Sequence, residues 1–414
     1  MTLREKAKAL ILKNYELTGR KYIAPSLPHY KMQWLWDSCF HAIVAAELGM
    51  HDLAKNEISS LLQWQQPEGW IPHQISHGLP ISRHASLEWR TFPEKYFRHH
   101  SSYTQPPLLA QAVEAIGDPN FTKEVFPKLL KFYLYFAEKR DPDKDHLISI
   151  IHPCEARDNS PEFEPLLPKF TGLRKILNRW QPLRYVKLGE EYRQVEWQIE
   201  AIWQKNLFNV EDLMFHCIWA EGLRTLAKLA DNGCPQDSRS LNGLAEKAEK
   251  AVFELCWDEK EKIFYSLDNK NGHRKLKPMS ISNLFPLILD NLPKTMADGL
   301  VEHLTNPSEF WTNYPVPCVS LQSGRRITNF GTLFKIWGEP TVWVNTNWFV
   351  LKGLVKHGYS DLARTLSKKT VEMVEREGFW ELYHPVTGNG LRKISRNFGW
   401  STLAITFPKI IGEK

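Results

Sequence analysis

Features that would mark a membrane or nucleic-acid-binding protein are missing from this chain. No apolar run approaches the ~18 residues of a membrane-spanning helix, and no block of five or more like charges occurs. The 53 basic and 47 acidic residues are interspersed along the 414 positions. We therefore expect neither a membrane protein nor a partner of nucleic acids.

Cysteine is also scarce and irregularly spaced. The six cysteines form no CxxC pair, so neither a zinc site nor a disulfide framework is expected. The charged first residues are followed by no apolar stretch of the kind found in a signal peptide. Together these features predict a cytoplasmic protein with reduced, mostly buried thiols.

Tryptophan, in contrast, is abundant, with sixteen residues. Indole rings present large flat faces, which suit either a deep core or a site that stacks flat ligands. Composition alone leaves both interpretations open.

Apolar positions recur with helical spacing through most of the sequence. The spacing predicts about eleven or twelve helices with short connections, over residues 2–17, 36–49, 52–66, 103–117, 121–139, 209–231, 241–256, 281–303, 342–357, 360–376 and 398–411. Short extended runs are expected only near 147–151, 263–267 and 316–321. The pattern predicts an all-α chain forming a single domain over 1–414, and twelve helices in six hairpins would close into an α/α toroid.

Residues 153–206 interrupt the helical pattern and are rich in Pro, Arg, Trp and Tyr. A long irregular segment inside a compact domain is usually functional or disordered. Its aromatic content favours an ordered insertion that acts as a lid over a site.

Polar and aromatic residues gather at the connections between helices. The clusters cover residues 33–38, 69–74, 102–107, 152–161 and 378–388. Taken singly, each can be an ordinary loop, and Asp37 can be a helix cap. The fourth cluster, with Glu155 and Asp158, follows an extended run, where catalytic groups are often presented. In the fifth, Glu381 stands between Trp380 and Tyr383, an environment that can keep a carboxyl group from bulk water.

Two isolated carboxylates among aromatic loops are what glycoside hydrolysis requires. One protonates the leaving oxygen, and the other activates water or attacks the anomeric carbon. The residues alone leave a carbohydrate-active enzyme as one interpretation beside ordinary surface loops.

The order of the clusters resembles the glycoside hydrolases of family 63, and most closely their short microbial branch of mannosylglycerate and glucosylglycerate hydrolases. The matching segments lie at 34–42, 69–73, 104–107, 155–161, 310–317, 340–348 and 379–388, so they cover nearly the whole chain. The resemblance implies an (α/α)6 toroid that hydrolyses an α-glycosidic bond of a small soluble carbohydrate with inversion. It implies no metal and no redox cofactor.

The resemblance also assigns roles to residues. The general acid falls on Asp158 and the general base on Glu381, while Asp37 would grip sugar hydroxyls near the anomeric carbon. Seven more positions match the lining of the pocket, namely Trp34, Trp36, His73, Gln105, Trp343, Asn345 and Trp380. An anionic aglycone would need a cation, which Arg157 or one of the insertion's arginines (Arg174, Arg179, Arg184 and Arg193) could supply.

The sequence departs from the family pattern at Gly338-Glu339, where Arg-Gly is frequent, and at His384, where Asn or Asp is frequent. Other interpretations on the same toroid are a trehalase, an invertase or an oligosaccharide α-glucosidase. An epimerase would depend on paired histidines, and a sugar-binding protein would keep the pocket without turnover.

Overall fold

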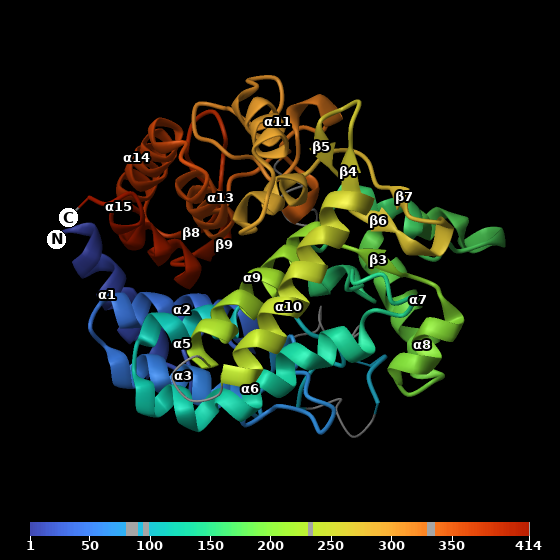
Figure 1. Ribbon diagram of the computed structural model, residues 1–414, viewed down its shortest axis with the longest axis horizontal. Coiled ribbons are helices and arrows are strands. Elements are labelled where there is room, and N and C mark those ends of the chain that lie inside the picture. Colours follow the sequence, from blue (N-terminus) through green and yellow to red (C-terminus); the bar gives the residue numbers. More distant parts are fainter. Residues whose placement is uncertain (80–89, 94–98, 231–234, 329–335, 414) are drawn as a thin grey trace.

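The computed structural model describes residues 1–79, 90–93, 99–230, 235–328 and 336–413. Helices dominate it, and the strands are short and paired (Figure 1). Within these residues, no helix is both long enough and apolar enough to cross a membrane.

Six helical segments of the described chain form a closed inner ring. Each contacts the next one along the chain, and the last contacts the first. In order they are α2 (Leu35–Glu47), α5 (Leu109–Ile116), α9 (Leu213–Ala230), the 3-10 helix η6 (Ile281–Ile288), α13 (Val344–Lys356) and the 3-10 helix η9 (Gly399–Thr406).

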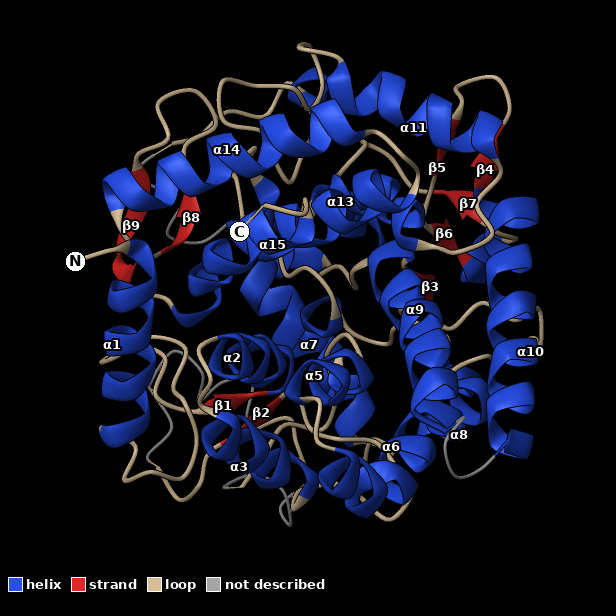
Figure 2. Ribbon diagram, turned by 60° about the vertical axis from the view of Figure 1, so that its left-hand side comes forward, coloured by secondary structure: helices blue, strands red, loops and turns tan. Residues whose placement is uncertain are grey.

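A second set of helices surrounds this ring, as Figure 2 shows. Its members are α1 (Leu3–Glu16), α3 (His51–Leu62), α6 (Pro119–Lys139), α10 (Pro235–Ala251), α11 (Lys294–Thr305) and α14 (Ser360–Glu377). The first helix, α1, contacts both α2 and η9, so the beginning and end of the chain meet (Figure 1). The fold is therefore an (α/α)6 toroid, which confirms the predicted class.

The two rings differ in sequence as their positions require. In α2 every residue from Leu35 to Ala46 is buried, because an inner helix is enclosed on all sides. In α14 the buried residues form a stripe at helical spacing: Ala363, Leu366, Ser367, Thr370, Met373 and Val374. That amphipathic pattern places α14 on the outside.

Two predicted helices are shorter than the periodicity suggests. The expected helix 103–117 begins only at Leu109, after Pro106 and Pro107. The expected helix 281–303 is divided into η6 and α11 around Pro293. Proline lacks the N–H that continues a helix, so the division falls where the backbone loses a donor.

The segment 153–206 is more helical than predicted. It holds the short 3-10 helices η1 (Pro153–Glu155), η2 (Pro161–Leu166) and η3 (Gly172–Arg179), then α7 (Gln181–Arg193), the bend after it and α8 (Ile199–Lys205). The expectation of an irregular segment was wrong for α7 and α8. Pro182 falls in the first turn of α7, where proline is tolerated, so its presence did not exclude a helix. Movement of the segment as a lid stays a prediction.

The strands pair in small antiparallel groups. They are β1 (Gln33–Trp34) with β2 (Gln74–Ile75), β3 (Val210–Glu211) with β6 (Leu267–Asp268) and β7 (Arg274–Lys275), β4 (Trp257–Asp258) with β5 (Ile263–Phe264), and β8 (Trp380–Tyr383) with β9 (Gly390–Arg396). Of the predicted extended runs, 263–267 contains β5 and the first residue of β6. The runs at 147–151 and 316–321 form only isolated bridges, through Ile150, Pro317 and Val319. The C-terminal chain finishes with α15 (Phe407–Ile410).

The described cysteines are free thiols. Cys39, Cys217, Cys256 and Cys318 are buried and Cys154 is half-buried, as predicted. Cys234 lies outside the described residues.

Candidate active site

Asp37 occupies the first turn of the inner helix α2, three residues after Trp34 at the N-cap position. The backbone N–H of Trp36 donates to Oε1 of Gln105 at 3.2 Å, which ties the start of α2 to the segment before α5. Asp37 is 2% exposed. Burial, followed by the charge of Glu381, raises the pKa of Asp37 well above its usual range. The structure thus brings Asp37 and Glu381 together.

Glu381 lies on β8 and is 3% exposed. Tyr30 donates its hydroxyl to the carboxylate, at 3.1 Å from Oε1 and 3.3 Å from Oε2. The indole of Trp400 donates to the Glu381 carbonyl at 3.2 Å. Tyr30 thus holds the carboxylate of Glu381, and Trp400 holds the strand that carries it.

Trp380, the preceding residue of β8, does not join this group. Its indole donates to the Glu377 carbonyl at 2.9 Å, packs on Gly390 and lies beneath the guanidinium of Arg396. Trp380 therefore packs on α14 and β9, at a point of β8 where the pairing with β9 shifts register. Its assignment to the pocket lining stays a prediction without support from these contacts.

A continuous series of stacked and edge-on rings connects the Glu381 region with the loop of Asp158. In order, the rings belong to Tyr30, Trp34, His73, Tyr103, His152 and Tyr185. The tightest parallel stack is Tyr103 on His152, with centroids 4.7 Å apart. Burial lowers the pKa values of His73 and His152 to about 3, so both imidazoles are neutral at pH 7.

Asp158 lies at the far end of this series of rings and is partly exposed. The next residue, Asn159, has a φ of 64°, a left-handed conformation that asparagine adopts more readily than most residues. Its backbone N–H donates to the Tyr185 hydroxyl at 2.7 Å, and its side-chain amide donates to Oδ2 of Asp158 at 3.0 Å. Asn159 therefore orients the predicted general acid.

Arg157 is held by protein groups beneath the same loop. Its guanidinium pairs with Glu162 at 2.6 Å and with Asp212, and it also donates to Ser280 at 2.7 Å. Burial by itself lowers the pKa of Arg157, but the charges of Asp212 and Glu162 raise it above its usual value. The guanidinium is thus engaged in a buried ion-pair network, and a role in binding an aglycone stays a prediction.

The arginines of the insertion differ in their surroundings. Arg184 is buried and donates to the carbonyls of Leu167 and Pro168. Arg174, Arg179 and Arg193 are exposed.

Four buried tryptophans, among them Trp36 next to Asp37 in sequence, pack on one another and form a tryptophan floor. Trp343 stacks on Trp337 with centroids 3.8 Å apart and planes 12° from parallel. Trp36 contacts Trp337 and Trp400 contacts Trp343 in tilted arrangements, and Trp36 and Trp400 meet edge-on. The Trp343 indole donates to Thr341 at 2.8 Å. Because Trp337 covers one face of Trp343, the stacked pair acts as one rigid aromatic unit.

Several predicted site residues keep hydrogen-bonding capacity that no described protein group uses. These buried atoms are Oδ1 of Asp37, Nε1 of Trp34, Nδ1 of His73, and both polar side-chain atoms of Asn345. Buried polar atoms are nearly always satisfied by protein, water or ligand. Asn347, two residues further along α13, shows the contrast: its amide bonds Val316, Pro315 and Thr370 at 2.8–3.0 Å.

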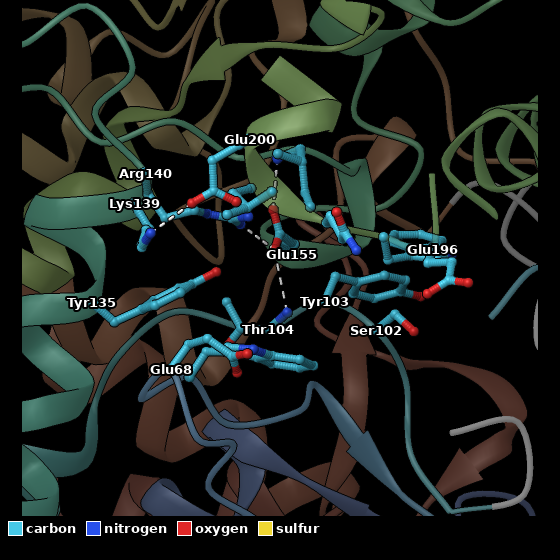
Figure 3. A pocket seen from close by; sticks show the side chains of 15 residues that line it. Glu68, Ser102, Tyr103, Thr104, Tyr135, Lys139, Arg140, Glu155, Glu196 and Glu200 are labelled. Atoms are coloured by element: carbon cyan, nitrogen blue, oxygen red, sulfur yellow. Dashed lines mark hydrogen bonds and ion pairs between the residues drawn. The ribbon is translucent and has the colours of Figure 1, made fainter. Parts of the chain in front are cut away.

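A cavity of about 400 Å³ lies next to the series of rings (Figure 3). Tyr103 and Thr104 line it from one side, and the buried Arg140–Glu155 ion pair lies across from them (Figure 3). Glu155 also accepts from the backbone N–H groups of Thr104 and Ile151. Glu155, the second acid of the fourth sequence cluster, therefore has a structural role.

Both departures from the family pattern have local structural partners. Glu339 accepts from the hydroxyl of Thr328 at 3.1 Å. The ring of His384 accepts from the backbone N–H groups of Val386 and Thr387 and so caps a turn.

Sequence reasoning missed four residues that shape the site: Tyr30, Tyr103, Tyr185 and Trp400. Tyr103 lies inside one of the polar and aromatic clusters, but the others stand in segments without a polar pattern, and only the fold brings them to Glu381 and Asp158. Within the described chain, no predicted site residue belongs to a group that could hold a metal ion.

Comparison with known proteins agrees with this geometry. Residues 30–401 match the family model described as the mannosylglycerate hydrolase MGH1-like glycoside hydrolase domain. A mannosylglycerate hydrolase of Thermus thermophilus is 28% identical over 423 residues, covering 93% of this chain and 96% of the relative. A glucosylglycerate hydrolase of Mycolicibacterium hassiacum is 25% identical over 434 residues, covering 96% and 95%.

A solved structure is similar over the same length. A family 63 mannosylglycerate hydrolase of Thermus thermophilus, in complex with Tris and D-glycerate, superposes with a TM-score of 0.83 at 27% identity, covering 98% of this chain and 99% of that one. The family match covers most of the chain and the toroid is shared. The chain therefore belongs to glycoside hydrolase family 63, near its mannosylglycerate and glucosylglycerate hydrolase branch, and is a glycosidase.

Proposed function

We propose that this glycosidase hydrolyses the α-glycosidic bond of a small glycoside of glycerate, glucosylglycerate or mannosylglycerate, with inversion at the anomeric carbon. The observation that carries the proposal is the group of buried, unpartnered polar atoms on Asp37, Trp34 and His73. A sugar offers hydroxyls for such atoms and C–H faces for the surrounding rings. The names of the two enzyme relatives and the D-glycerate in the solved structure support glycerate as the aglycone.

In the proposed reaction, Asp158 donates its proton to the glycosidic oxygen as the bond to the anomeric carbon breaks. Glu381 takes a proton from a water molecule on the opposite face of the ring, and the oxygen of that water forms the new bond. Inversion needs about 6.5–9.5 Å between the two carboxyl groups, so that the water fits between base and sugar.

The hydrogen bonds at the two acids are suited to these roles. The hydroxyl of Tyr30 favours the ionised form of Glu381, which a base requires. The amide of Asn159 orients Asp158 by donating to its Oδ2 atom. Asp37 and Asn345 would bind hydroxyls of the sugar ring, and the tryptophan floor would support the ring face.

The proposal is tested by incubating the enzyme with glucosylglycerate, mannosylglycerate, trehalose, sucrose and a malto-oligosaccharide. We expect release of the sugar from one of the two glycerate glycosides, with the β-anomer appearing first in an NMR time course. The first appearance of the α-anomer would refute inversion. Preferred cleavage of trehalose, sucrose or the oligosaccharide would refute the substrate class.

The two acids are tested by Asp158→Asn and Glu381→Gln, with Asp361→Asn on the exposed start of α14 as the matched control. Each catalytic variant should lose about 10²–10⁴-fold in kcat, while the control keeps full activity. Unchanged circular dichroism would show that the fold is intact. Residual activity near the wild-type value in a folded variant would remove that residue from its role.

A further inference from the structure

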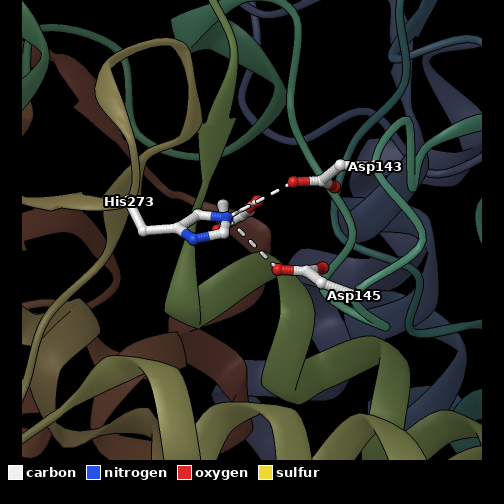
Figure 4. A group of neighbouring side chains, drawn as sticks. Asp143, Asp145 and His273 are labelled. Carbon is white, nitrogen blue, oxygen red and sulfur yellow. Dashed lines mark ion pairs between the residues drawn. The ribbon is translucent and has the colours of Figure 1, made fainter.

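Four potential metal ligands meet at a place that includes none of the predicted site residues. Asp143 and Asp145 belong to the loop after α6, Glu211 ends strand β3, and His273 lies in the turn between β6 and β7. One ligand atom from each lies within 4.8 Å of the others. Figure 4 shows the two aspartates and the imidazole pointing toward one another.

The separations suit a single bound ion. Nε2 of His273 lies 3.3 Å from an oxygen of Asp143, 3.3 Å from an oxygen of Asp145 and 3.5 Å from Oε1 of Glu211. Ligands about 2.1–2.4 Å from a common ion are about 3.0–3.9 Å from their neighbours in octahedral or tetrahedral arrangements. The three distances from Nε2 of His273 fall within that interval.

Glu211 provides an independent sign that a ligand belongs here. Its side chain is 1% exposed and points into the cluster, yet Oε2 has no hydrogen-bond partner among the described residues. Oε1 accepts from the amide of Asn269, which orients the carboxylate as an outer contact orients a metal ligand. A buried carboxylate oxygen without a donor is costly unless a cation or a proton compensates it.

Within the group of four ligands, the acidic side chains outnumber the basic one. Three carboxylates face a single imidazole, which can give one N–H through Nε2 and carry at most one positive charge. Oδ2 of Asp145 is also buried and has no hydrogen-bond partner among the described residues. A divalent cation would compensate the remaining negative charge and satisfy these oxygens together.

We propose that Asp143, Asp145, Glu211 and His273 bind one divalent cation. Three carboxylates and one imidazole form a mixed oxygen and nitrogen set, which suits Mn²⁺ or Zn²⁺ better than Mg²⁺. The ion would connect the loop after α6 to the β3–β6–β7 sheet. It would thereby hold Asp212, which follows Glu211 and pairs with Arg157 next to the catalytic loop. Its role is structural, because none of its ligands is a predicted catalytic residue.

The test uses the full-length enzyme stripped with EDTA, which is then removed by dialysis. Isothermal titration and thermal melts are recorded with MnCl₂, ZnCl₂, CaCl₂ and MgCl₂ in the absence of any glycoside. We expect one bound Mn²⁺ or Zn²⁺ per chain and a melting temperature several degrees higher than without metal. No binding of any of these ions at millimolar concentration would overturn the proposal.

Variants locate the ion. The double variant Asp143→Asn/Asp145→Asn changes partly exposed side chains and should fold, yet lose the titration heat and the metal-dependent shift. The control Asp52→Asn, a fully exposed carboxylate, should keep both. Equal binding by the double variant would place any ion elsewhere and refute the site.

His273→Ala tests the imidazole separately. We expect it to weaken Mn²⁺ and Zn²⁺ binding at least tenfold and to change the electron paramagnetic resonance spectrum of bound Mn²⁺. Unchanged affinity and spectrum would refute the mixed ligand set. Because every readout is binding or melting, failure here is independent of the proposed glycosidase reaction.

Discussion

The hydroxyl of Tyr30 bridges both carboxylate oxygens of Glu381, at 3.1 and 3.3 Å, across 351 positions of sequence. Tyr30 comes from the segment before β1, and Glu381 comes from β8 near the end of the chain. The contact joins the first and last parts of the toroid at the predicted catalytic base.

Replacing Tyr30 with phenylalanine tests that contact. A hydrogen bond to a charged group contributes about 1.5–3 kcal/mol, and here the donor favours the ionised base. We expect Tyr30→Phe to lower kcat/KM about tenfold or more at neutral pH and to move the acid limb of the pH–rate profile upward.

The matched control is Tyr359→Phe, an outer-ring tyrosine that hydrogen-bonds Lys294 and Asp298. It should leave the pH–rate profile unchanged. An unshifted acid limb in Tyr30→Phe would show that the phenol does not influence the base.

Asp37→Asn should stabilise the folded protein while lowering its catalytic activity. Burial and the Glu381 charge raise the pKa of Asp37 in the folded state. The unfolded chain gives up this proton near pH 4 and the folded chain holds it longer. The free energy of unfolding therefore falls as pH rises from about 4 through the folded-state pKa.

An amide at position 37 does not ionise, so it removes the free-energy cost of a buried charge at neutral pH. We expect the variant to gain on the order of 0.5–2 kcal/mol at pH 7, little at pH 4, and to lose tenfold or more in kcat/KM. Urea unfolding at both pH values measures the difference. A destabilised variant at pH 7 would contradict the electrostatic argument.

Asn345 and Asn347 form a matched pair on α13. The Asn345 amide is buried without a partner among the described residues, whereas that of Asn347 makes three hydrogen bonds. We expect Asn345→Ala to lower kcat/KM about tenfold with an unfolding free energy within about 0.5 kcal/mol of wild type.

Asn347→Ala should instead lose about 1–3 kcal/mol of stability, because its buried partners become unsatisfied. Steady-state kinetics and urea unfolding of both variants check the contrast. If Asn345→Ala lost stability and kept activity, its amide would be structural.

Arg157→Met tests the ion-pair network below the catalytic loop. Removing the guanidinium leaves Glu162 and Asp212 as buried charges without their cation, which typically costs about 3–5 kcal/mol. Adding Glu162→Gln should recover part of that loss. Urea unfolding measures both.

The control is Arg364→Met, which breaks an exposed pair with Asp361 on the outer helix α14. Exposed pairs contribute about 0–1 kcal/mol, so this variant should unfold near the wild-type concentration. If Arg157→Met lost no more unfolding free energy than Arg364→Met, the ion-pair network would not support the catalytic loop.

The sequence by itself determined the helical class, because apolar spacing at 3.6 residues shows which face each helix buries. It also located the clusters that hold Asp37, Asp158 and Glu381, since polar residues interrupt the helical pattern there. Ordered motifs identified the family from the same segments.

Only the tertiary structure decided which side chains meet. Trp380 and Glu381 are neighbours in sequence, but Trp380 packs against Arg396 while Glu381 accepts from Tyr30. Arg157 adjoins the predicted acid in sequence, yet its guanidinium forms ion pairs with Asp212 and Glu162. The metal-binding group draws on the loop after α6, on β3 and on the β6–β7 turn, and no local pattern connects these three. Long-range contacts depend on how the rings of the toroid close, and a periodicity that repeats within one helix carries no information about that closure.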